Sequence, residues 1–193
     1  MAAPDSPAPP AAETARLRLR EQVPQDIEFF AEMLGDPETL VHWPRPLTRE
    51  EAERWIAQNR RRYAEDGFGW WAVELRETGE LLGDCGLATY TIDGVSEVEL
   101  GYHFHRRNWG HGYATEAARA LLQWGFDTLP LNRVQAEADT RNAASARVLE
   151  KLGFVHEGTL REDCVVNGDV SDSRVYGLLR REWRSPSDAA AGG

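Results

Sequence analysis

Two glycines, Gly110 and Gly112, stand directly before a stretch with helical periodicity. The first turn of a helix has free backbone N–H groups and the positive end of the helix dipole, so a glycine turn at this place can bind phosphate. Arg106, Arg107 and His111 can add charge-assisted hydrogen bonds. The pattern is neither a P-loop, since no Lys-Ser or Lys-Thr follows, nor a dinucleotide fingerprint, since a third glycine is missing. The first prediction is therefore an anion site.

Three histidines offer a competing chemistry. His103, His105 and His111 form the pattern H-x-H-x₅-H, and three imidazoles can ligate zinc. However, the two glycines favour an anion-binding turn at this place, and no nearby Cys or Asp pattern completes a metal site. We therefore expect no metal.

The turn has to be positioned by a strand before it and a helix after it. Apolar and polar residues alternate between Glu97 and Phe104, which predicts a strand with one buried face. From Tyr113 to about Phe126 apolar residues recur at helical spacing, which predicts a long helix.

Other segments predict a single domain of mixed strands and helices. Strands are expected at residues 15–21, 70–75, 81–90, 132–139, 154–165 and 172–179, and helices at 24–34, from 48 through at least 63, and at 143–151. Thr48 and Glu51 form a capping box, and Gly153 ends the last helix. Trp55 and Tyr63 are expected to pack on the sheet rather than to line a cleft. Neither a repeat nor a linker divides the chain.

Composition limits the classes of partner. The 193 residues carry a formal net charge of −10, which argues against nucleic acid and leans weakly towards a cationic or neutral partner. No apolar run approaches the roughly 18 residues of a membrane span. Cys85 and Cys164 are too few for a disulfide framework, and reduced thiols in a cytoplasm are the expected state. Residues 1–13 and 184–193 are expected to be disordered tails.

The glycine turn carries a family resemblance. Residues 107–112, RNWGHG, match the signature Q/R-x-x-G-x-G/A in full, and the overlapping register 109–114 has Trp at its first position. The strand, turn and helix resemble motif A of the GNAT acetyltransferases. Residues 101–117 are similar to the RimJ/RimL-like (ribosomal-protein N-acetyltransferase-like) branch, which typically reads GYW-L-D-P-x-Y-W-G-K-G-Y-A-T-E-A.

Further motifs extend the resemblance to about residues 14–183. Residues 14–20 resemble the opening T-x-R-L-x-L-R of the branch, and residues 142–154 resemble N-x-x-S-x-x-x-L-E-K-L-G-F. The resemblance implies one α/β (α+β) GNAT domain over residues 14–183, with a mixed, mostly antiparallel sheet of six to seven strands flanked by helices. Agreement among several motifs carries this assignment.

By the same resemblance, the donor substrate is acetyl-CoA. Its pyrophosphate is expected beside Arg107, on the backbone amides of Trp109, Gly110, His111, Gly112, Tyr113 and Ala114. Its pantetheine arm is expected to pair with the strand at Tyr102, His103 and Phe104, as an added strand would. The Asn142 side chain is expected to hydrogen-bond the arm, to cap the following helix, or to do both.

The implied reaction is direct transfer of the acetyl group to an amine, which needs no protein nucleophile. Many GNATs use a tyrosine to assist the sulfur at the position where this chain has Leu149. The RimJ/RimL-like branch instead uses a serine early in this helix, and by that resemblance Ser145 is expected to take the role. Plain exposure on the helix surface is the alternative for Ser145. Glu99 is preferred over Glu137 as the base that deprotonates the ammonium, because burial can raise its pKa. A water wire could replace either carboxylate.

The sequence thus predicts a cytoplasmic, acetyl-CoA-dependent N-acetyltransferase that binds neither nucleic acid nor membrane. The favoured acceptor is a protein or peptide N-terminal α-amine. Polyamines, aminoglycosides and amino-acid derivatives stay open as small-molecule acceptors, and a non-catalytic acyl-CoA-binding sensor is the alternative from another class. A homodimer also stays open.

Overall fold

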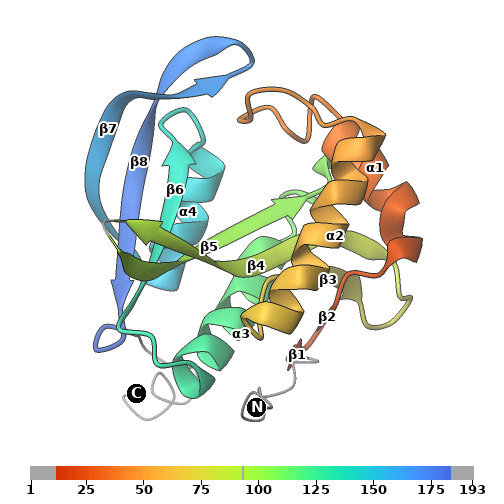
Figure 1. Ribbon diagram of the computed structural model, residues 1–193, viewed down its shortest axis with the longest axis horizontal. Coiled ribbons are helices and arrows are strands. Elements are labelled where there is room, and N and C mark those ends of the chain that lie inside the picture. The colour runs from red at the N-terminus through yellow and green to blue at the C-terminus, as the bar shows by residue number, and fades with distance from the viewer. Residues whose placement is uncertain (1–11, 93, 184–193) are drawn as a thin grey trace.

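The computed structural model describes residues 12–92 and 94–183, and the two expected tails lie almost wholly outside these ranges. Within them, eight strands form one sheet in the order β1-β2-β3-β4-β5-β6-β8-β7 (Figure 1). The strands are β1 (Ala12–Glu13), β2 (Leu17–Arg20), β3 (Trp70–Leu75), β4 (Leu81–Ile92), β5 (Val95–Phe104), β6 (Arg133–Asp139), β7 (Val155–Val166) and β8 (Asp169–Leu179). The helices are α1 (Ile27–Gly35), α2 (Arg49–Glu65), α3 (Tyr113–Thr128) and α4 (Ala143–Leu152).

The strand directions agree with the predicted fold class. Neighbouring strands from β1 to β5 are antiparallel, and so are β6 with β8 and β8 with β7. Only β5 and β6 are parallel in the part of the chain described, because α3 crosses over between them. β1 has two residues and begins before the expected domain boundary at residue 14, which leaves seven longer strands. The mixed, mostly antiparallel sheet is confirmed.

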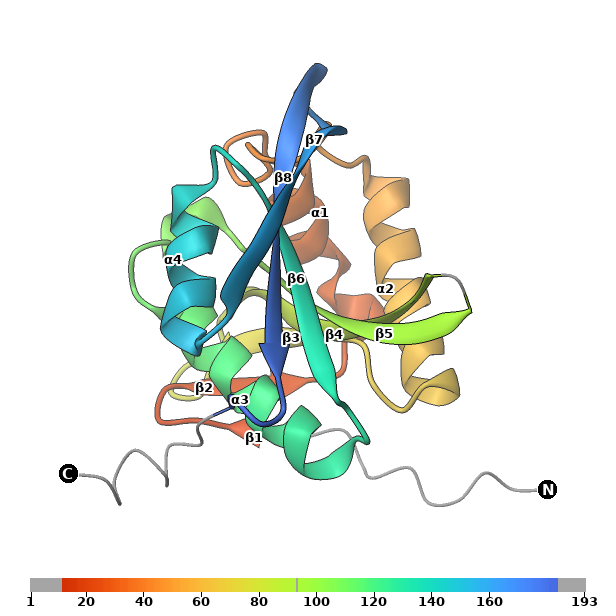
Figure 2. The ribbon, with the colours of Figure 1, turned by 90° about the vertical axis from the view of Figure 1, so that its left-hand side faces the viewer.

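Helices cover both faces of the sheet. Figure 2 shows α4 on one side of β6 and β8 and α2 on the other. The larger core joins α3 and α4 to the sheet through residues such as Leu121, Leu149 and Trp71. A smaller core joins α1 and α2 to Ala72. Because successive strand residues face opposite sides, Trp71 and Ala72 contribute to different cores.

The local signals for helix ends are confirmed. The Thr48 side chain accepts a hydrogen bond from the backbone N–H of Glu51, and the Glu51 carboxylate accepts one from the backbone N–H of Thr48. Gly153 follows α4 with a φ of 91°, in the left-handed region that glycine adopts without strain.

The two halves of the sheet separate between β5 and β6. Glu99 and Gln135 form the one registered pair between these strands among the described residues. Beyond that pair, the last five residues of β5 run to Phe104 without a partner on this side. The sheet therefore opens into a wedge, and one edge of β5 is available inside it.

Candidate active site

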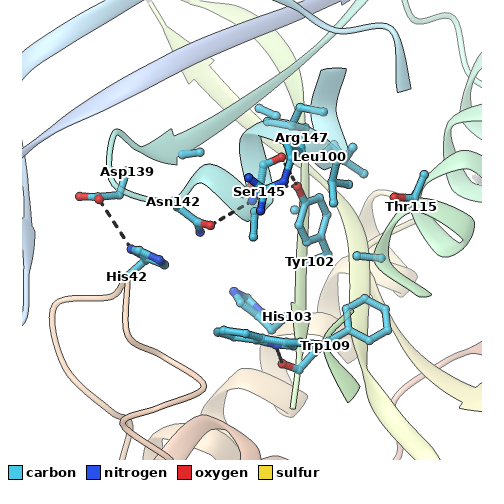
Figure 3. A pocket seen from close by; sticks show the side chains of 18 of the residues that line it. His42, Leu100, Tyr102, His103, Trp109, Thr115, Asp139, Asn142, Ser145 and Arg147 are labelled. Atoms are coloured by element: carbon cyan, nitrogen blue, oxygen red, sulfur yellow. Dashed lines mark hydrogen bonds and ion pairs between the residues drawn. The ribbon is translucent and has the colours of Figure 1, made fainter. Parts of the chain in front are cut away.

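A cleft of about 800 Å³ occupies this wedge. Its walls come from β5, β6, the N-terminal turn of α3, most of the length of α4, the loop at residues 39–43, and single residues of α2 and β3. Figure 3 shows side chains of β5 and α4 together with His42 of that loop around one open space. Segments far apart in the sequence thus meet where the two strands diverge.

The glycine turn closes one end of the cleft. Gly110 and Gly112 both have a φ of 80°, so side chains at these places would strain the backbone. Gly112 is the N-cap residue of α3, which leaves the first amides of the helix without a capping side chain. The Trp109 indole N–H donates to the carbonyl oxygen of Phe104 at 2.6 Å and ties the loop to β5 (Figure 3).

The structure gathers most of the expected donor-binding residues. The following residues line the cleft: Tyr102, His103, Phe104, Trp109, Gly110, Gly112, Tyr113, Ala114 and Asn142. Arg107 and His111 do not line it: Arg107 forms an ion pair with Glu32 at 3.0 Å, and His111 stacks on Tyr113. Asn108, which was not expected in the site, lines the cleft as well.

Ser145 faces the cleft from the first turn of α4. The Asn142 side-chain oxygen accepts a hydrogen bond from the Ser145 backbone N–H at 3.0 Å, so the expected capping role of Asn142 is confirmed. The Ser145 hydroxyl lies 2.8 Å from the Tyr102 hydroxyl (Figure 3). Burial raises the pKa of Tyr102, which keeps the phenol protonated and able to donate.

The side chain of Tyr102 makes a contact that was not predicted from the sequence. From the sequence, only the backbone of Tyr102 was expected to take part, and α4 has Leu149 where many GNATs carry a tyrosine. The structure brings a phenol to Ser145 from β5, across 43 positions of sequence. Tyr102 lies on the apolar face of the strand. This position was a signal in the sequence that its side chain points to the core under α3 and α4.

Two carboxyl groups line the same cleft. Burial, with a smaller contribution from the negative charge of Glu137, raises the pKa of Glu99 to about 7. Burial and the charge of Asp163 also raise the pKa of Glu137, whose carboxylate accepts a hydrogen bond from Gln135 at 3.0 Å. Glu99 thus has a pKa suited to exchange protons near neutrality.

An aromatic cluster forms the wall opposite α4. Trp43, Trp55 and Trp70 all line the cleft, and each lies within 6 Å of the His103 ring, measured between ring centroids. Trp55 also packs against the smaller core. The expected packing of Trp55 is confirmed, but the expectation that it does not line a cleft is wrong, because a residue at the edge of a core can do both.

The three histidines of the pattern H-x-H-x₅-H have different neighbours. The His103 ring pairs with Asp84, His105 lies 3.4 Å from the Glu32 carboxylate, and His111 stacks on Tyr113. Across residues 12–92 and 94–183, no group of three or more His, Cys, Asp or Glu side chains could hold a metal ion. Likewise, no described helix is long and apolar enough to cross a membrane.

Comparisons with known proteins place the chain in a family. The profile described as Acetyltransferase (GNAT) domain matches residues 16–155, and the chain belongs to this family of acetyl-CoA-dependent N-acetyltransferases. The uncharacterized protein YkkB of Bacillus subtilis (strain 168) is 36% identical over 150 residues, which cover 77% of this chain and 87% of YkkB. The putative ribosomal N-acetyltransferase YdaF of the same organism is 34% identical over 173 residues, which cover 86% of this chain and 92% of YdaF.

Solved structures agree on the fold. RimL, a ribosomal L7/L12 α-N-protein acetyltransferase in complex with coenzyme A, matches with a TM-score of 0.73. The match covers 86% of this chain and 95% of RimL at 18% sequence identity. The predicted family and class of enzyme are confirmed, and the solved structures that share the fold include the ribosomal-protein acetyltransferase RimL.

Proposed function

We propose that this enzyme transfers the acetyl group of acetyl-CoA directly to a primary amine, and that the preferred acceptor is the α-amine of a protein or peptide. One observation carries the proposal. The wedge between β5 and β6 joins a glycine turn, an unpaired strand edge, a pair of hydroxyl groups and a carboxyl group with a pKa of about 7 in one cleft.

Backbone groups of the cleft can bind the donor substrate, acetyl-CoA. The left-handed glycines leave the amides at the start of α3 open to a pyrophosphate, and the helix dipole favours its negative charge. The edge of β5 from Leu100 to Phe104 can pair with the amide groups of the pantetheine arm. The Asn142 amide N–H₂ stays available to the arm, because only the side-chain oxygen is used in the cap.

Ser145 and Tyr102 are suited to the departing sulfur. As the bond between carbon and sulfur breaks, negative charge develops on sulfur and a hydrogen-bond donor stabilises it. The Ser145 hydroxyl can donate to sulfur while it accepts a hydrogen bond from Tyr102. We assign Ser145 to this step and Tyr102 to the orientation of its hydroxyl.

Glu99 is suited to deprotonate the acceptor. An ammonium cannot attack a thioester, so its first proton must leave before the bond to carbon forms. Glu99 lies at the closed end of the wedge, where β5 and β6 still pair, and its carboxylate is available at and above neutral pH. Glu137 is the alternative carboxylate on the facing strand.

The choice of acceptor rests on the relatives. YdaF is named a putative ribosomal N-acetyltransferase, and RimL acts on the α-amine of a ribosomal protein. The aromatic wall of the cleft offers surface for the side chains of a peptide that follow its N-terminus.

A screen of acceptors by release of the CoA thiol tests the proposal. Peptides with a free N-terminus are compared with the same peptides blocked at that end, and with polyamines, aminoglycosides and free amino acids. We expect turnover only with free N-termini, and a mass increase located on the first residue. Turnover restricted to small amines would overturn the acceptor, and acetyl-CoA binding without any turnover would favour an acyl-CoA sensor.

A further inference from the structure

His103 is held in one orientation by a buried carboxylate. Its Nδ1 lies 2.9 Å from Oδ1 of Asp84, the residue directly opposite on β4. Asp84 is fully buried, and the His103 side chain is 9% exposed. The other Asp84 oxygen, Oδ2, accepts hydrogen bonds from the Trp55 indole at 2.8 Å and the Gln22 amide at 3.1 Å.

These contacts define which ring nitrogen is free. Asp84 accepts N–H hydrogen bonds on Oδ2, and when it accepts on Oδ1 as well, Nδ1 of the His103 ring is the donor and Nε2 keeps a lone pair. Nε2 has no partner among the described residues and is not one of their buried unpaired atoms, so it is open to the cleft. Figure 3 shows the His103 ring beside the open space that Tyr102 and Ser145 also border.

Aromatic contacts fix the plane of the ring. The Trp70 indole stacks on it with an interplanar angle of 7° and 4.8 Å between centroids, and Trp43 meets it nearly edge-on at 4.9 Å. The sequence makes room for this indole with two glycines. A Cβ at Gly101 would lie 2.1 Å from the Trp70 ring, and one at Gly86 would lie 2.5 Å from it.

Direct acetylation of an amine requires the nitrogen to lose two protons. An ammonium has three N–H bonds and the amide product has one, so one proton leaves before attack and a second leaves after the bond to carbon has formed. Glu99 accounts for one of them in the function proposed above. His103 and Glu99 lie on the same face of β5, on either side of Gly101, and both line the cleft.

We propose that His103 is the acceptor of the second proton and that Asp84 is its positioning residue, an assignment that rests on the proposed transfer to an amine. After the amine nitrogen has bonded to the acetyl carbon, its proton passes to Nε2, directly or through one water. The bond from carbon to sulfur then breaks, the thiolate is protonated, and the imidazolium returns its proton to solvent. One acetyl group is transferred and one proton is released.

Few other titratable groups face this ring. Asp84 contacts it from β4, while α2 and β3 contribute the uncharged rings of Trp55 and Trp70. Tyr63 of α2 lies near Asp84 but not on the cleft. The ionisation of His103 is assigned by substituting His103 itself, because other titratable or charged residues line the cleft elsewhere: His42, Glu99, Glu137, Asp139, Arg141, Arg147 and Lys151.

The test measures turnover between pH 5.5 and 9 with an acceptor found in the thiol-release screen. His103→Gln should lower kcat roughly a hundredfold near neutrality and remove one ionisation from its pH profile, with the KM for acetyl-CoA within about twofold. Asp84→Asn should lower kcat at least about tenfold while the ring stays in place. In His103→Ala, added imidazole should restore part of the rate, which a structural role for the ring would not permit.

His156→Gln is the matched control, because that histidine lies on β7 and does not line the cleft. Its kcat and pH profile should equal those of the wild type. If His103→Gln keeps both ionisations and a rate within twofold, or if imidazole restores nothing to a folded His103→Ala variant that binds acetyl-CoA, the assignment is overturned. Wild-type protein that acetylates no amine would overturn the proposed function itself, and the assignment with it.

Discussion

Replacing Glu99 by Gln should make the protein more stable at alkaline pH. Burial and the charge of Glu137 raise the pKa of Glu99 from an ordinary 4.5 to about 7 in the folded state. Between these two values the folded state keeps a proton that the unfolded chain releases, so wild-type stability falls as the pH rises. At about 1.4 kcal/mol per pH unit, the difference amounts to about 3 kcal/mol above pH 7.

The assay is urea unfolding of both proteins between pH 4 and 9. The free energy of unfolding of Glu99→Gln relative to wild type should rise from pH 4.5 to 7 by up to about 3 kcal/mol and then level off. Glu28→Gln is the control: because Arg49 lowers the pKa of that exposed carboxyl, its difference from wild type should stay constant above pH 4.5 and change, with the opposite sign, only below it. A difference between Glu99→Gln and wild type that does not change with pH would refute the claim that the cleft raises this pKa.

Three further predictions concern binding and rate. Gly112→Val should weaken acetyl-CoA binding at least about tenfold in calorimetry, whereas Gly79→Val, an equally left-handed glycine in a distant turn, should not change it. Ser145→Ala should lower kcat roughly tenfold or more with unchanged acetyl-CoA affinity; an unchanged kcat would remove its role at sulfur. Glu99→Gln should lose one ionisation from the acidic limb of the pH–rate profile, leaving the one assigned to His103, and recover much of the wild-type rate at high pH; if Glu137→Gln loses that ionisation instead, Glu137 and not Glu99 is the base.

Local features of the site could be predicted because neighbours along the chain determine them. The alternation before residue 104 and the helical spacing after Tyr113 give the strand and helix, and the two glycines give the turn between them. Asn142 is followed by a helix, so its cap could be predicted too. In each case the physical cause lies within about one turn of the residue itself.

The contacts across the cleft could not be predicted in the same way. Asp84 meets His103 only because β4 and β5 pair in one particular register, and a shift by one residue would send the carboxyl to the other face. Trp43 and Trp55 reach the same ring from a loop and a helix. Such convergence depends on tertiary packing, for which spacing along the sequence gives no signal.

The unpaired edge of β5 has a consequence for turnover. Coenzyme A differs from the donor substrate only by the acetyl group, so it keeps every group that the proposed pyrophosphate and pantetheine contacts use. Those contacts hold substrate and product equally and cannot accelerate the chemical step. We therefore expect free coenzyme A to compete with acetyl-CoA for the wedge. Coenzyme A then slows the enzyme as it accumulates. The ratio of acetylated to free coenzyme A, rather than either concentration alone, sets the working rate.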